Sequence, residues 1–169
     1  MSLPFPEPTT PIDSRTEVLL GYLDYFRSAL VAKLEGLPAE ELRRSRLPTG
    51  WTPLELLKHL IQVEIRWLEW GFEGQPIAEP WADQRDGRWY VAPEETLADL
   101  TVALRTQAGR SRALVQAHDL AEFGQPGERW DGAEPATLER ILLHLTQEYA
   151  RHLGQLDIVT ELAGGPVGE

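Results

Sequence analysis

The sequence of 169 residues contains no cysteine. This absence excludes structural disulfides, metal sites built from thiolates, and catalysis by a cysteine nucleophile. Any thiol chemistry at this protein therefore requires a thiol that comes from another molecule.

The sequence is also poor in positive charge and has no long hydrophobic run. Its 16 lysines and arginines stand against 27 aspartates and glutamates, which gives a formal net charge of −11. Such a charge repels phosphate backbones, so we expect no nucleic-acid partner. No run approaches the roughly 18 apolar residues of a membrane span, and the N-terminus lacks a basic segment followed by an apolar one. We therefore expect a cytoplasmic protein without a membrane partner.

Hydrophobic residues make up 42% of the chain and recur at helical spacing, whereas no alternating strand pattern or fixed repeat is present. Four amphipathic segments predict an all-α four-helix bundle, with loops long enough for crossovers. We expect a proline-rich, extended lead-in over residues 1–12, one bundle domain over 13–165 and a tail over 166–169. The helices are expected over residues 13–36, 53–70, 93–118 and 137–163.

Local signals mark the first turns of the first three helices. The segments Ser14-x-x-Glu17 and Thr52-Pro53-x-Glu55 have the spacing of a capping box, and proline suits the first helical position. The third helix is expected to begin at Pro93-Glu94-Glu95, because carboxylates in a first turn interact favourably with the helix dipole.

A long loop is expected over residues 71–92, between the second and third helices. It contains Trp81, Trp89 and Tyr90 among glycines, prolines and charged residues. Loops of this length in a compact domain are usually functional or mobile. The segment from Trp81 to Tyr90 is therefore a candidate cover for a substrate, with simple packing as the alternative for its aromatic residues.

The fourth helix carries two polar residues on its apolar face. Glu148 and His152 are four residues apart, which places them side by side on a helix. An isolated buried carboxylate is costly, so Glu148 requires a partner. A metal ion is one candidate, because both side chains could reach one ion about 2 Å away. A carboxylate–imidazole pair without metal is the alternative. The apolar positions around them are Leu138, Ile141, Leu145, Leu156, Val159 and Ala163.

A third metal ligand would have to come from another helix. His59 is the best candidate, because it lies at the border of the apolar face of the second helix. His144 lies one further step of four before Glu148 and is a candidate fourth ligand, a support for a ligand, or a proton carrier. His118 lies near the end of the third helix, where a charged imidazole suits the dipole.

Two segments resemble signatures of the DinB-like superfamily. The stretch Leu142–Asp157, which includes Glu148-x-x-x-His152, resembles its fourth-helix signature, and Thr52–Leu60 resembles its second-helix signature. Common members carry three histidines, whereas Glu148 occupies one of those positions here. That departure matches the subgroup resembling mycothiol-dependent maleylpyruvate isomerase. The resemblance implies a DinB-like bundle with long crossover loops, often a homodimer, and a metal held by His59, Glu148 and His152.

The resemblance also implies a chemistry for this site. Two histidines and one carboxylate leave a coordination position open, as in catalytic zinc sites. We expect zinc first, with nickel, iron or manganese as alternatives. The first hypothesis is an S-transferase or isomerase that uses a small thiol, mycothiol or bacillithiol, and an electrophile. A non-catalytic metal-binding or stress-associated protein is the second hypothesis, and it predicts that small molecules cannot reach the ion. Hydrolysis by metal-bound water is a third, for which His144 offers a base.

Overall fold

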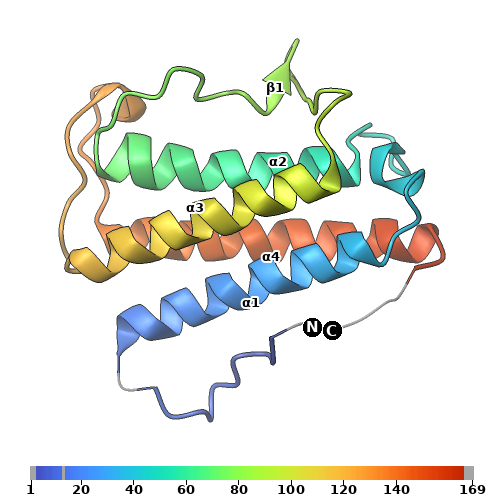
Figure 1. The fold of residues 1–169 in the computed structure, drawn as a ribbon. Helices are drawn as coiled ribbons and strands as arrows, with labels where there is room; N and C mark the ends of the chain where they lie inside the picture. Colours follow the sequence, from blue (N-terminus) through green and yellow to red (C-terminus); the bar gives the residue numbers. More distant parts are fainter. Residues whose placement is uncertain (1–2, 13, 166–169) are drawn as a thin grey trace.

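The computed structural model describes residues 3–12 and 14–165. Its four long helices pack lengthwise into a bundle (Figure 1). They are α1 (Arg15–Glu35), α2 (Pro53–Glu64), α3 (Leu97–Ala117) and α4 (Leu138–Leu162). This arrangement confirms the all-α four-helix bundle. Asp13 and the expected tail over residues 166–169 lie outside the described residues.

The order of the helices around the bundle is not the order of the chain. Helix α1 packs against α3 and α4, and α2 packs against the same two helices. Helices α1 and α2 are therefore diagonal to each other, at the bottom and top of Figure 1. The loop from α1 to α2 and the loop from α3 to α4 both cross the bundle, whereas α2 and α3 are neighbours. No described helix is long and apolar enough to cross a membrane.

Leucine dominates the core between these helices. The bundle interior includes fully buried leucines from each helix, and burying one such side chain contributes about 1.5 to 3 kcal/mol. Because residues three and four apart share one helix face, these leucines form a continuous apolar seam. The core residues without exposed surface include Leu20, Leu23, Leu30, Leu56, Leu57, Leu60, Leu142, Leu145 and Leu156.

The helix starts predicted from the capping signals agree with the structure except at the third helix. Thr52 and Glu55 form the expected capping box, with Pro53 as the first residue of α2. The third helix begins at Leu97 rather than at Pro93, because Thr96 and Asp99 form a capping box there. Sequence analysis misplaced this start because the acidic pair before Thr96 resembles a first helical turn.

Several short elements complete the fold. A π-helix, η2 (Ile65–Phe72), extends α2, and two 3-10 turns occur at η1 (Glu41–Arg43) and η3 (Glu128–Trp130). Strands β1 (Gln84–Arg85) and β2 (Arg88–Trp89) form a small antiparallel hairpin in the long loop. The sequence shows no alternating pattern at this hairpin, because two residues per strand are too few to show alternation.

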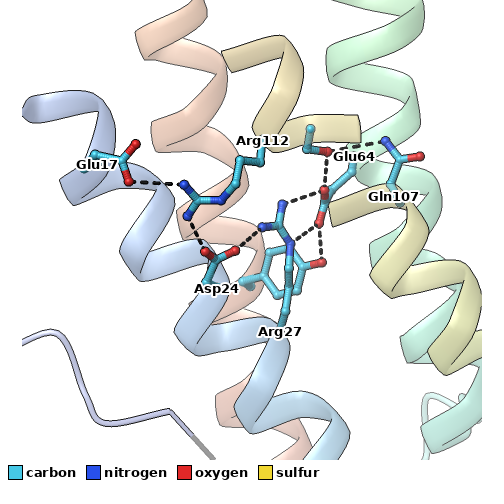
Figure 2. Close-up of polar contacts among 8 residues, drawn as sticks. Glu17, Asp24, Arg27, Glu64, Gln107 and Arg112 are labelled. Atoms are coloured by element: carbon cyan, nitrogen blue, oxygen red, sulfur yellow. Dashed lines mark hydrogen bonds and ion pairs between the residues drawn. The ribbon is translucent and has the colours of Figure 1, made fainter. Parts of the chain in front are cut away.

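A buried polar network links all four helices (Figure 2). Its centre is the Glu64 carboxylate on α2, which accepts hydrogen bonds from Nε (2.8 Å) and Nη2 (2.7 Å) of Arg27 on α1. The Ser111 hydroxyl on α3 and the Tyr149 hydroxyl on α4 each donate to it at 2.6 Å. Burial and the Glu64 charge raise the pKa of Tyr149, so its hydroxyl stays protonated and donates. The network is therefore closed and internally satisfied.

Candidate metal centre

The bundle brings His59, Glu148 and His152 together between α2 and α4. One potential ligand atom from each residue lies within 4.8 Å of the other two. Oε2 of Glu148 is 3.3 Å from Nε2 of His152. Donor atoms around an ion with bonds of about 2 Å lie at comparable separations, so the three residues fit one divalent cation.

Hydrogen bonds fix the orientation of both imidazole rings. Nδ1 of His59 lies 2.8 Å from Oδ2 of Asp83, and Nδ1 of His152 lies 2.9 Å from Oε1 of Gln155. An ionised carboxylate and an amide oxygen only accept hydrogen bonds, so each Nδ1 must carry the proton. This tautomer leaves the Nε2 lone pair of both rings available to a metal ion.

Asp83 is the functional residue that sequence analysis missed. It belongs to the long loop after η2 and has no exposed surface. Arg66 on the π-helix donates to both of its carboxylate oxygens, at 2.7 Å and 3.2 Å. Burial raises the pKa of Asp83, but the hydrogen bonds from His59 and Arg66 outweigh this effect, so the pKa lies below its ordinary value. No periodicity marks a loop residue of this kind, and the aromatic content of the loop was the one available signal.

The aromatic residues of the long loop divide between two roles. Trp89 stacks on the His59 ring, with 4.2 Å between ring centroids and an angle of 22°, and its edge faces His152. Trp81 is half exposed and lies over the Arg66 guanidinium instead. Within the segment from Trp81 to Tyr90, Trp89 thus packs beside the two candidate histidine ligands. Trp81 instead supports Arg66, the arginine that binds Asp83.

The other two histidines lie outside the group of three. Nε2 of His144 is 3.5 Å from Oε1 of Glu148, the carboxylate oxygen that does not face His152. The His144 ring also packs edge-on against Trp67. Among the three roles considered for His144, this position favours support of Glu148. His118 pairs with Glu122 at the end of α3 and does not join the site.

The electrostatic environment favours the metal-binding forms of the ligands. The hydrogen bond from His152 is the main cause that lowers the pKa of Glu148. Burial lowers the pKa of His59, and the hydrogen bond to Asp83 offsets part of that shift. Both shifts keep a carboxylate and a neutral imidazole present near neutral pH, and these are the protonation states that ligate metal.

A hollow of about 350 Å³ opens beside Glu148 and His152. Gln155, Trp51 and Trp89 are also part of its lining. Small-molecule sites typically begin at about 300 Å³ and combine apolar walls with a few polar groups. A small molecule in this hollow can therefore reach Glu148 and His152, two of the three side chains that would hold the ion.

Fold and site together define a class: helical bundles with a His–Glu–His group, suited to a divalent ion, between two neighbouring helices. Within this class, the chain belongs to the mycothiol-S-transferase family, whose model matches residues 18–165. No curated protein matches the chain. The narrower likeness to maleylpyruvate isomerase stays a prediction.

Solved structures share the fold at low sequence identity. A DinB-like protein from Bacillus cereus ATCC 10987 is 18% identical, with a TM-score of 0.63 over 90% of this chain and 95% of that one. YfiT from Bacillus subtilis, described as a probable metal-dependent hydrolase with an unusual four-helix bundle topology, is also 18% identical. Its TM-score is 0.63, over 94% of this chain and 93% of YfiT. These matches establish the DinB-like fold.

Proposed function

We propose that this protein is a metal-dependent S-transferase that joins a low-molecular-weight thiol to an electrophile. One divalent ion would be held by Nε2 of His59, the Glu148 carboxylate and Nε2 of His152. The observation that carries the proposal is the convergence of these three donors, within 4.8 Å of one another, beside a hollow that Glu148 and His152 line. Membership of the mycothiol-S-transferase family supports a thiol as the co-substrate.

The chemistry follows from the donor set and its surroundings. Two imidazoles and one carboxylate leave a position open, and a bound divalent ion favours the thiolate form of a thiol at neutral pH. Asp83 and Gln155 hold the two rings in place, and Trp89 limits water at the ligands. The thiolate sulfur forms a bond to the electrophilic carbon, whose leaving group departs with its electron pair. The thiol proton would pass to solvent, with His144 as its proposed carrier.

The finer identities follow from the same proposal. Zinc is the first choice of metal, with nickel, iron or manganese as alternatives, because imidazole and carboxylate suit all four. Mycothiol or bacillithiol is the proposed thiol. A homodimer and a cytoplasmic location are further predictions.

The test combines elemental analysis with turnover. We expect one divalent ion per chain in the purified protein and its loss in His152→Ala. His118→Ala removes a histidine outside the site and should retain the metal. The metal-loaded protein should conjugate mycothiol or bacillithiol to a fluorogenic electrophile, and removal of the metal should abolish this activity. Unchanged metal content in His152→Ala would contradict the proposed site.

Hydrolysis is the second candidate function. It is favoured by the position of His144 beside Glu148, where a base could assist a water molecule. A panel of ester and amide substrates distinguishes the two candidates, because hydrolysis requires no thiol. The non-catalytic alternative predicts an inaccessible site, and the hollow argues against it.

A further inference from the structure

Arg151 lies at the mouth of the candidate metal centre. It follows Glu148 by three residues on α4 and immediately precedes His152, and its side chain lines the same hollow as both. The side chain is exposed, so a ligand in the hollow can reach it. Arg151 therefore adds a permanent positive charge to a site that otherwise contains one carboxylate and two imidazoles.

Nothing in the described chain engages the Arg151 side chain, and the same holds for Arg88, Arg105 and Arg140. Arg151 differs from these three because it lines the hollow beside Glu148 and His152. Several other arginines bind carboxylates, as Arg27 binds Glu64 and Arg66 binds Asp83. Across residues 3–12 and 14–165, no hydrogen bond, ion pair or ring contact involves the Arg151 guanidinium. Glu148, the nearest acid along the helix, faces His144 and His152 instead. All donor groups of the Arg151 guanidinium are therefore free to bind a ligand.

We propose that Arg151 is a carboxylate-binding residue of this site, which makes the substrate class a small molecule with a carboxylate near its reacting atom. The inference rests on the proposed function and specifies one of its reactants. A guanidinium presents its N–H donors in a fork that matches the two oxygens of a carboxylate. It fits a carboxylate better than it fits any neutral group. The tryptophan wall formed by Trp51 and Trp89 would contact the apolar part of the same molecule.

The overall charge of the protein strengthens this assignment. At a net charge of −11, the surface as a whole repels anions. An anionic substrate therefore needs a local positive group at the site, and Arg151 supplies one within the hollow. The carboxylate can belong to the thiol or to the electrophile, since both must occupy the site during transfer.

The first experiment measures binding to the zinc-loaded full-length protein by calorimetry. It uses probe pairs that differ in charge: 3-mercaptopropionate with 3-mercapto-1-propanol, and the sulfur-free pair succinate with succinamide. We expect the acidic member of each pair to bind about tenfold more tightly. Arg151→Gln should reduce this preference to within about twofold, and Arg151→Lys should retain part of it because lysine keeps the charge but loses the fork.

The matched control is Arg140→Gln. Arg140 is an exposed arginine of the same helix, roughly 16 Å away along its axis at 1.5 Å per residue. The variant loses the same charge and should keep the full preference for the acidic probes. A loss of preference in both variants would show a general field effect and overturn the specific role of Arg151.

A second experiment identifies the reactant that carries the carboxylate. The thiol 3-mercapto-1-propanol is alkylated by iodoacetate or by iodoacetamide, each rate being corrected for the reaction without protein. In this step the carbon–sulfur bond forms, iodide leaves with its electron pair, and the thiol proton passes to solvent. A preference for iodoacetate that requires Arg151 assigns the carboxylate to the electrophile. A preference confined to 3-mercaptopropionate binding assigns it to the thiol.

Failure of this inference and failure of the proposed function have different signatures. Equal affinity for both members of each pair, or a preference that survives Arg151→Gln, overturns the carboxylate site. The proposed function fails if neither thiol changes the absorption spectrum of the cobalt-loaded protein. In that case, binding of succinate that depends on Arg151 would still support the inference.

Discussion

Two polar clusters lie inside this bundle, and they differ in whether their polar atoms already have hydrogen-bond partners. In the network around Glu64, each carboxylate oxygen accepts hydrogen bonds from neighbouring side chains (Figure 2), and Glu64 itself has no exposed surface. In the candidate metal centre, Nε2 of His152 and Oε2 of Glu148 face each other at 3.3 Å. When Nδ1 carries the only ring proton, both atoms are acceptors. The contact is then attractive only with a second ring proton, which donates to Glu148, or with a cation bound between the two atoms.

The comparison separates a structural cluster from a functional one. Glu64 is more deeply buried than Glu148, yet its charge is fully paired by Arg27. Burial of a charge is therefore a poor marker of function in this chain. Acceptor atoms without a donor, at the wall of an accessible hollow, are the better marker. The adjacent residues Glu148 and Tyr149 illustrate the division, since one faces the site and the other faces the network.

The largest effect should come from breaking the network. Glu64→Ala leaves Nε and Nη2 of the buried Arg27 without their acceptor, with Asp24 as the remaining partner of its Nη1. This change should lower the free energy of unfolding by about 3 to 5 kcal/mol. The control is Glu139→Ala, which removes the partly exposed partner of the exposed Arg15 and should cost less than about 1 kcal/mol. Urea denaturation measures both. A cost below about 1 kcal/mol for Glu64→Ala would remove the distinction between the two clusters.

The second effect concerns metal and stability. If the metal binds only the folded chain, saturation at 100 times its Kd should raise the free energy of unfolding by about 2.7 kcal/mol. Chelation should reverse the gain, and His152→Ala should show none of it. Thermal denaturation with and without metal measures this. An equal gain in His152→Ala would place the ion elsewhere.

A pair of adjacent substitutions sharpens the comparison. Tyr149→Phe removes the hydroxyl that donates to Glu64 and should cost about 1.5 kcal/mol while metal content is unchanged. Glu148→Gln should abolish metal binding and change the stability of the metal-free protein by less than about 1 kcal/mol. Elemental analysis and urea denaturation of both variants check the result. If Tyr149→Phe also lost the metal, the two clusters would form one unit.

A smaller effect is expected from the residue that orients His152. Gln155→Ala removes the acceptor for Nδ1 of this ring, so both tautomers become available. Loss of such a partner should weaken metal affinity by about tenfold, or about 1.4 kcal/mol. Competition with a chromogenic chelator measures the affinity. Gln155→Glu keeps an acceptor and should restore the affinity, and failure of that restoration would count against the orienting role.

The smallest effect is the pH dependence of the metal-free protein. The pKa of His59 is lowered from 6.5 in the folded state, mainly by burial, with Asp83, His152 and Arg66 facing the ring. The unfolded chain therefore binds the proton more readily, and this contribution to stability is present above pH 6.5 and declines as the pH falls below it. NMR titration of the ring should give a midpoint below 6.5. A midpoint above that value would show that Asp83 outweighs burial.

Much of the fold could be predicted from the sequence, because helix signals are local. Thr52 caps α2 within one turn of the chain, and the start of α4 after Thr137 lies within a residue of expectation. The start of α3 was misplaced because Glu94 and Glu95 imitate a first helical turn. The diagonal relation of α1 and α2 has no local signal, since it depends on which faces pack after the loops close.

The candidate site was predictable only in its helical part. His59, Glu148 and His152 could be nominated because helical periodicity places them near the apolar faces of two helices. Asp83 and Arg66 could not be nominated as a pair that supports His59, since one lies in a loop and the other in a π-helix. Neither element follows the periodicity of 3.6 residues that identifies the inward face of an α-helix.

The sequence by itself determined which residues form helices and which polar groups lie on the inward faces, because both depend on spacing within a few turns. Only the tertiary structure decided that Asp83, 24 residues from His59, would fix the tautomer of that ring. It also decided that Trp89 would stack on His59 and that Arg151 would line the same hollow as the ligands. These contacts join segments that are distant in the chain, and their formation depends on how the loops and helices pack rather than on any local pattern.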